Sequence, residues 1–252
     1  MRIYSFGALD GFPNALEAPA FLIEDKGTRI LVDVPANIQL YLHEIGLSVM
    51  DLDAIVITHL HNDHIGGLVD LIQLRTICLN NEDLMRDAGY FTTISTRVLP
   101  IHVGGYIANQ DYWRDVICKQ LDFNCPKKGE HWSKYVERLS AGLGGGSFLI
   151  ENTEVCWRET THSTACIGVK VGGVAISGDG PCAGDHLVWL MQGTSLVFHE
   201  AGYAGSHTKF ADLPEIMKRC PSVQFYHLPF PAKEFALACG YPIAEKRWYD
   251  VP

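Results

Sequence analysis

The feature that most constrains this chain is a cluster of ionisable side chains that follows directly on a short apolar run. Residues 54–59 read AIVITH, which is typical of a short buried strand. The run ends in His59, and His61, Asp63 and His64 follow it. Because side chains two residues apart on an extended strand point to the same side, His59 and His61 are expected to face one volume. A turn before the glycine pair at 66–67 would bring Asp63 and His64 into the same volume.

Imidazole and carboxylate groups are ligands that suit Zn²⁺, with Mn²⁺ and Fe as competitors. The alternative is a solvent-exposed polar turn. With 11 histidines in the chain, this spacing would arise by chance in roughly one chain in a thousand. The cluster also directly follows a buried strand. We therefore predict a metal site here.

Four ligands are too few for two metal ions, so further ligands are expected downstream. His162 follows EVCWRETT, Asp179 follows VAISG and His227 follows SVQFY. A polar residue just beyond an apolar strand is a common place for an active-site group in layered folds. These three residues are the predicted partners of the cluster.

Apolar runs alternate with helical periodicity along most of the chain. Strands are expected at 1–6, 19–25, 29–34 and 54–59, and again, after a glycine-rich break at 142–146, at SFLIE, EVCWRETTH, IGVKV, VAISGD, 196–200 and 222–227. Helices are expected at 36–45, after the glycine pair at 66–67, and at 108–121, 131–140, 183–191 and 212–219. Two strand-rich halves with helices outside predict an α/β fold, the four-layer αββα sandwich, in a single domain over 1–252 with an extra segment at about 90–146.

Charge and composition limit the classes of partner. The net charge of -9 disfavours loose binding to nucleic acid or to an anionic membrane. No apolar run approaches the roughly 20 residues of a membrane span, and the N-terminus lacks a stretch of signal-peptide length, so a cytoplasmic location is expected. None of the eight cysteines forms a CxxC pair, which indicates reduced thiols.

The complete set of predicted ligands resembles that of the metallo-β-lactamase superfamily. The resemblance implies that His59, His61 and His162 hold one divalent metal ion. It implies that Asp63, His64 and His227 hold the second, and that Asp179 bridges the two. An aspartate at the bridging position argues against the antibiotic-degrading enzymes of the superfamily, and His61 in place of glutamate argues against its di-iron branch.

Smaller motifs are similar to those of the ribonuclease Z branch. They are GALDGFP at 7–13, His162-Ser163 followed by Gly168, SGD at 177–179, and His199-Glu200-Ala201, where Gly202 replaces the usual threonine of that branch. Ribonuclease Z carries a long basic arm that grips transfer RNA, between the third-motif histidine and the SGD segment. Only 16 residues separate His162 from Asp179 in this chain, so the arm is absent.

The missing arm favours a small phosphodiester, as in the arm-less cyclic-nucleotide phosphodiesterases of the anti-Pycsar type. The leading hypothesis is hydrolysis of 3′,5′-cyclic mononucleotides to nucleoside monophosphates, which would suppress cyclic-nucleotide immune signalling. Transfer-RNA 3′ processing and hydrolysis of a lactone or thioester are the alternatives. The resemblance also implies a small-molecule nucleotide substrate and a homodimer.

Catalytic roles are expected for three residues. Asp63 is predicted to orient the nucleophile, and His199 to act as the general acid, held by Glu200. Asp33, at the end of a strand, is either a ligand-orienting carboxylate or an ordinary turn residue. His207 is expected at the surface, with contact to a phosphate or to a partner subunit as the alternatives.

Overall fold

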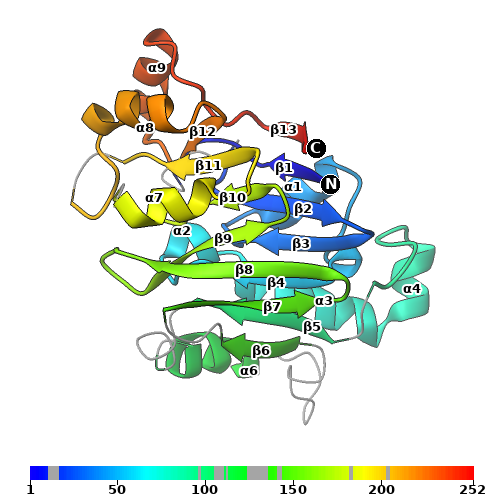
Figure 1. Ribbon diagram of the computed structural model, residues 1–252. Helices are drawn as coiled ribbons and strands as arrows, with labels where there is room; N and C mark the ends of the chain where they lie inside the picture. Colours follow the sequence, from blue (N-terminus) through cyan, green and yellow to red (C-terminus); the bar gives the residue numbers. More distant parts are fainter. Residues whose placement is uncertain are drawn as a thin grey trace.

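The fold is built on two β-sheets, seen in a computed structural model that describes residues 1–10, 17–95, 98–104, 111, 113–123, 136–140, 144–181, 184–202 and 205–252 (Figure 1). Over these residues the first sheet has seven strands, in the spatial order β13 (Arg247–Asp250), β1 (Arg2–Ser5), β2 (Phe21–Asp25), β3 (Thr28–Val32), β4 (Ala54–Ile57), β5 (Leu99–Val103) and β6 (Val136–Ser140). Pairing is antiparallel from β13 to β3 and parallel from β3 to β6.

The second sheet has six strands within the same described ranges. Their order is β12 (Val223–Tyr226), β11 (Leu196–Glu200), β10 (Val174–Ile176), β9 (Cys166–Val171), β8 (Thr153–Thr160) and β7 (Gly145–Ile150). Strands β7 to β10 pair in antiparallel fashion, whereas β10, β11 and β12 are parallel. Each sheet therefore joins an antiparallel part to a parallel part, and the parallel strands all end at one edge.

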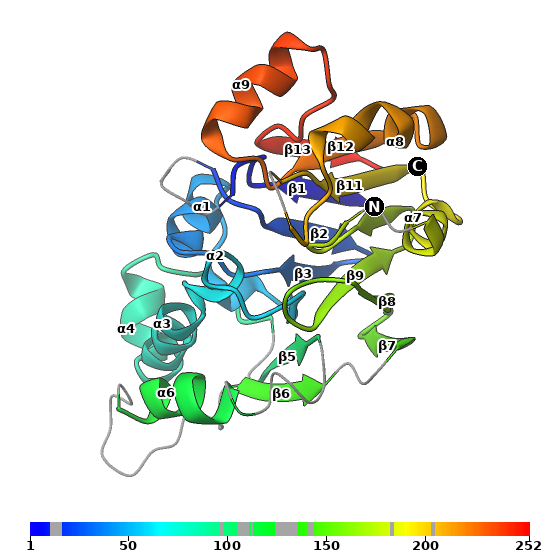
Figure 2. The same cartoon turned by 90° about the vertical axis from the view of Figure 1, so that its left-hand side faces the viewer.

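Helices cover the outer faces of the two sheets, which gives the predicted αββα order of layers (Figure 2). The first sheet is flanked by α1 (Ile38–Glu44), α2 (Asn62–Ile65), α3 (Leu68–Asn80), α4 (Glu82–Asp87), and the η2 (Trp113–Cys118) and α6 (Lys119–Phe123) segments. The other helices are α7 (Gly184–Met191), α8 (Leu213–Arg219) and α9 (Phe230–Ala238), with short 3₁₀ turns η1 (Val49–Asp51) and η4 (Phe210–Asp212).

Alternation along the strands of the first sheet divides its apolar side chains between two cores. On β1, Ile3 faces the core between the sheets, and its neighbour Tyr4 faces the helices. On β2, Ile23 and Leu22 are divided in the same way. Both faces of the sheet are therefore buried, which explains why these strands read as continuous apolar runs.

One expectation about the segment 90–146 needs correction. In the predicted helix at 131–140, residues 136–140 are instead strand β6, which pairs in parallel with β5 from Leu99↔Val136 to Val103↔Ser140, while 131–135 lie outside the described residues. Both β5 and β6 extend the first sheet, and pairing to an existing strand edge outweighs the local helical pattern. The predicted helix at 108–121 is helical at each of its described residues, 111 and 113–121, while 108–110 and 112 lie outside the described residues.

Candidate metal centre

The predicted ligands gather where the parallel strands of both sheets end. Thr58 and His59 follow β4, and Asp179 follows β10 after a turn at Gly178. His227 follows β12 directly, and its φ of 60° is unusual for a residue other than glycine. Backbone strain of this kind persists where surrounding structure holds it, and it is common at functional sites. The common strand polarity thus brings distant segments of the chain to one edge.

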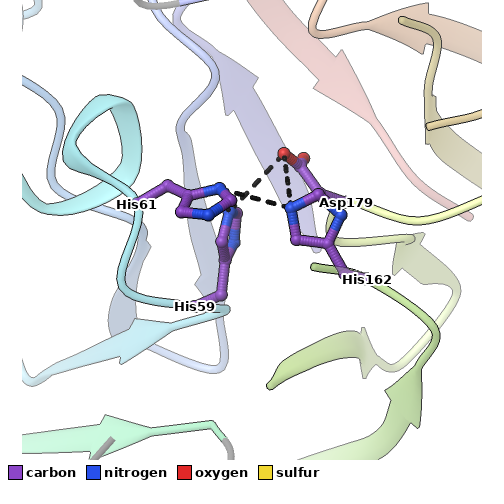
Figure 3. A group of neighbouring side chains, drawn as sticks. All are labelled: His59, His61, His162 and Asp179. Atoms are coloured by element: carbon purple, nitrogen blue, oxygen red, sulfur yellow. Dashed lines mark hydrogen bonds and ion pairs between the residues drawn. The ribbon is translucent and has the colours of Figure 1, made fainter. Parts of the chain in front are cut away.

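Three imidazoles and one carboxylate form the first group of convergent side chains (Figure 3). The Nδ1 atom of His61 lies 3.1 Å from Nε2 of His59 and 3.2 Å from Nε2 of His162. The Oδ2 atom of Asp179 is 3.5 Å from Nε2 of His59 and 4.0 Å from Nε2 of His162. The three ring nitrogens point at one another, and they cannot all form hydrogen bonds by donating a proton. Their lone pairs could instead share one cation, so this arrangement suits a metal ion.

Asp63, His64 and His227 form the second group. Nε2 of His227 is 2.9 Å from Oδ2 of Asp63, and Nε2 of His64 is 3.7 Å from the same oxygen. Oδ2 of Asp179 lies 3.4 Å from Nε2 of His64 and 3.3 Å from Nε2 of His227. Asp179 therefore contacts both groups, as a bridging ligand would.

The donor set fits two divalent cations on a further observation. Nε2 of His64 and both carboxylate oxygens of Asp179 are buried and form no hydrogen bond in the described part of the chain, although Nε2 of His64 lies 3.4 Å from Oδ2 of Asp179 as an ion-pair contact. Buried polar atoms are otherwise almost always paired, because an unpaired one costs on the order of 1–3 kcal/mol. Coordination of a metal ion would satisfy all three atoms.

The electrostatics of the two groups differ. Burial lowers the pKa of His59, His61 and His162, so these rings are neutral and have lone pairs to offer. Burial also opposes charge on His64 and His227, but nearby carboxylates, Asp179 first, outweigh it and raise the pKa of both. The carboxylates around the second group thus favour positive charge there, and a bound cation would meet the same attraction.

Asp33 contacts one predicted ligand imidazole directly and a second through Thr58, which favours the ligand-orienting interpretation of this residue. Its Oδ2 atom lies 2.7 Å from Nδ1 of His64 and accepts a 2.7 Å hydrogen bond from the hydroxyl of Thr58. The Thr58 hydroxyl in turn lies 3.1 Å from Nδ1 of His59. One buried carboxylate therefore fixes His64 directly and His59 through Thr58, and both present Nε2 to the centre.

His199 and Glu200 end strand β11, but their side chains have different surroundings. His199 is 1% exposed, and its Nδ1–H donates to the Glu200 carbonyl oxygen at 2.9 Å. Burial lowers the pKa of His199, so the ring is neutral. The catalytic role of His199 stays a prediction, and this buried position does not favour it.

His207 lies beside the predicted metal ligands, in contrast to the expectation of a surface histidine. Its Nδ1–H donates to Oε2 of Glu200 at 3.1 Å, and its ring stacks on His227 with centroids 5.3 Å apart. The hydrogen bond to Glu200 is the largest cause that raises the pKa of His207. The sequence signal that could have indicated this position is the short spacing after Glu200, which lets the chain turn back.

Gly202 explains how His207 approaches Glu200. A Cβ atom at Gly202 would lie 2.6 Å from Cβ of His207, and the Gly202 N–H bonds the Thr208 carbonyl oxygen at 3.0 Å. Thr208 N–H in turn donates to Oε1 of Glu200 at 2.6 Å. Gly202, which stands where the ribonuclease Z branch usually has threonine, therefore leaves room for the chain to turn back and place His207 beside Glu200.

None of the helices in the described ranges is long and apolar enough to cross a membrane.

Comparison with known proteins supports these observations at two levels. The family model described as anti-Pycsar protein Apyc1 matches residues 1–93. Ribonuclease Z of Metallosphaera sedula is 38% identical over 73 residues, which are 29% of this chain and 25% of that protein. Anti-Pycsar protein Apyc1 of Saccharibacillus brassicae is 45% identical over 68 residues, which are 27% of this chain and 28% of that protein. The matched stretches thus span about a quarter of the length of these relatives, and the family-model match over residues 1–93 includes the His59–His64 cluster.

The likeness to solved structures extends over the whole chain. The metallo-β-lactamase fold protein YhfI from Bacillus subtilis superposes with a TM-score of 0.72 at 15% sequence identity, covering 99% of both chains. Identity at this level shows the fold alone. The four-layer sandwich predicted from the sequence is therefore confirmed as the metallo-β-lactamase fold.

Proposed function

We propose that this metallo-β-lactamase-fold chain is a binuclear-metal phosphodiesterase that hydrolyses 3′,5′-cyclic mononucleotides to nucleoside monophosphates, and so suppresses cyclic-nucleotide immune signalling. The observation that carries the proposal is Asp179, whose buried Oδ2 atom contacts both groups of predicted ligands and has no hydrogen-bond partner among the described residues. Similarity of the N-terminal 93 residues to anti-Pycsar protein Apyc1 supports the substrate class. We propose Zn²⁺ as the metal, because imidazole and carboxylate ligands suit it.

A bound pair of divalent cations would lower the pKa of water and take up charge that develops on the phosphate oxygens. The chain's own residues would hold that pair with His59, His61 and His162 on one side and Asp63, His64 and His227 on the other. Asp63 faces the shared volume, where it would also orient the attacking water.

Departure of the ribose oxygen from phosphorus requires a proton, because an alkoxide is a poor leaving group. We assign this proton to His207 in preference to His199. The Nδ1–H of His207 is held by Glu200, and its pKa is raised, so the ring retains a proton to give. His199, buried behind the Glu200 carbonyl, has its pKa lowered instead.

A small substrate agrees with the connection between His162 and Asp179. All residues from 163 to 178 are described, and they form β9, β10 and the turns beside them. No arm that would grip transfer RNA is inserted there, and the net charge is -9. Both observations favour a mononucleotide over a polyanion.

His207→Ala tests the assignment. With a 3′,5′-cyclic nucleotide, kcat should fall about 10²- to 10⁴-fold, the usual range for loss of a general acid. With bis(p-nitrophenyl) phosphate, whose phenolate leaves without a proton, kcat should change little. Metal content, measured by elemental analysis, should stay at the parent value.

The matched control is His43→Ala, which removes an exposed histidine on α1. It should leave kcat unchanged with both substrates. Equal losses on both substrates would show that His207 is not the proton donor. Cleavage by the parent of a homoserine lactone alone, or of precursor transfer RNA alone, would overturn the proposed function.

A further inference from the structure

His186 lies outside the convergent group, on the helix α7. It is 7% exposed, and its Nε2–H donates to the carbonyl oxygen of Ser177 at 3.1 Å. Burial lowers the pKa of His186 to about 4, so the ring is neutral, and its tautomer is the one with the proton on Nε2. A buried imidazole on a helix that otherwise packs leucines into the core requires an explanation.

The carbonyl that His186 binds lies where β10 leaves the sheet. Strands β9 and β10 pair as far as Val169↔Ile176. Ser177 is the next residue, and Gly178 then turns the chain with a φ of +64°. Asp179, the residue that contacts both ligand groups, follows this turn. The hydrogen bond from His186 therefore fixes the last peptide before the chain bends toward the metal centre.

Ser177 also connects this bend to Glu200. The hydroxyl of Ser177 accepts a 3.0 Å hydrogen bond from the Glu200 N–H, and the Ser177 N–H donates to the Phe198 carbonyl oxygen at 2.9 Å. A shift of Ser177 would thus displace the backbone that positions both Asp179 and Glu200. His186 holds this shared residue from the helix side.

Gly168 provides the space through which His186 reaches Ser177. A Cβ atom at Gly168 would lie 2.7 Å from Cε1 of His186 and 2.9 Å from the carbonyl oxygen of Ser177. Real Cβ atoms do not approach other atoms so closely, so a side chain at 168 would displace the imidazole. The hydrogen bond therefore needs both residues: His186 on α7 donates it, and Gly168 on β9 leaves the space for it.

We propose that His186 is a positioning residue that sets the bridging carboxylate Asp179 through the carbonyl of Ser177. The inference rests on the metal centre of the proposed function, but not on its substrate. His186 does not contact the metal site itself. It acts by orienting a residue that does, as the outer hydrogen-bond partners of metal ligands do. The hydrogen-bond donor, and not the bulk of the ring, is the feature that matters.

Metal affinity is the direct test, measured by competition for Zn²⁺ with a chromophoric chelator and without any substrate. His186→Leu keeps the bulk and removes the donor, and we expect affinity for the weaker-bound ion to fall about tenfold, the lower end of the effect of outer-shell partners. His186→Gln restores an N–H donor, and its affinity should stay within about threefold of the parent. The control is Leu190→Ala on the same helix, a fully buried core residue.

Leu190→Ala should lower the melting temperature and leave Zn²⁺ affinity within about twofold, because it removes packing alone. Parent-like affinity in a folded His186→Leu variant would overturn the inference. So would an equal loss of affinity in Leu190→Ala, or no recovery in a folded His186→Gln variant. If His186→Leu does not fold, recovery of parent-like affinity in His186→Gln would support the inference. A parent that binds no Zn²⁺ would instead contradict the proposed function itself.

Discussion

At the scale of single residues, Asp33 shows how one side chain organises the centre. Its φ of 64° places it in the left-handed region, which is costly for a residue with a Cβ atom. In that conformation its Oδ1 atom accepts the Thr58 N–H at 2.7 Å, while Oδ2 meets the Thr58 hydroxyl and His64. The strained backbone is thus held by three contacts of one buried carboxylate, and those contacts orient two ligands.

Asp33→Asn is expected to weaken metal binding without unfolding the chain. The amide keeps the shape, but it loses the negative charge and one of the two acceptor oxygens that contact Thr58 and His64. Loss of an outer-shell partner typically lowers metal affinity about 10- to 100-fold. Calorimetric titration with Zn²⁺ measures the change, and Asp70→Asn, at an exposed position on α3, is the control. Unchanged affinity would show that Asp33 only supports the turn.

At the scale of elements, strand β5 of the first sheet and strand β7 of the second are joined by a contact between two side chains. His102 on β5 stacks on Phe148 on β7, with ring centroids 3.8 Å apart and planes within 2° of parallel. His102 is 5% exposed, and burial lowers its pKa to about 4. The contact between the sheets at this point therefore includes a neutral imidazole.

The sign of the pH effect follows from that lowered pKa. Between the ordinary value of 6.5 and about 4, the unfolded chain binds a proton at His102 that the folded chain does not. The stabilising contribution is complete above pH 6.5 and is lost progressively as the pH falls toward 4. His102→Phe keeps an aromatic ring and removes this titration.

Urea unfolding at pH 7.5 and at pH 4.5 measures the effect. The parent should lose more stability than His102→Phe between these two values, so that the difference between them changes with pH. His43→Ala, at an exposed position on α1, should follow the parent. A constant difference between parent and His102→Phe would show that His102 does not titrate in this window.

At the scale of the whole molecule, the proposed metal centre would join the two halves of the sandwich. His59, His61 and His64 come from the first half, whereas His162 and Asp179 come from the second. Ions bound by both halves would stabilise only the folded chain, by about 2.7 kcal/mol at a free concentration 100 times the Kd. The homodimer and the cytoplasmic location implied by the resemblance and the composition remain predictions.

Removal of metal should therefore lower the melting temperature. For a chain of this size, about 2.7 kcal/mol corresponds to a shift of roughly 5–10 °C. Scanning calorimetry with and without a strong chelator measures it, and re-addition of Zn²⁺ should reverse it. His61→Ala should show a smaller shift, because one ligand is already missing. An identical melting temperature with and without chelator would contradict a metal shared by the two halves.

Much of the fold and of the metal centre could be predicted from the sequence, because the signals are local. The apolar run before His59 and the spacing up to His64 indicate a strand followed by a ligand-bearing turn. Similar runs before His162, Asp179 and His227 indicate the remaining ligands. The structure brings all of these side chains together, since the strands that carry them end at one edge.

The remaining features depend on contacts between distant segments, which only the tertiary structure decided. Strand β6 forms because the edge of β5 is available for pairing, although its own pattern favours a helix. His207 reaches Glu200 because Gly202 lets the loop close, whereas His199 is turned into the core. The sequence by itself determined which side chains can bind metal, because ligand chemistry belongs to the residue. The tertiary structure decided which histidine faces the centre, because that depends on packing around a bend of the chain.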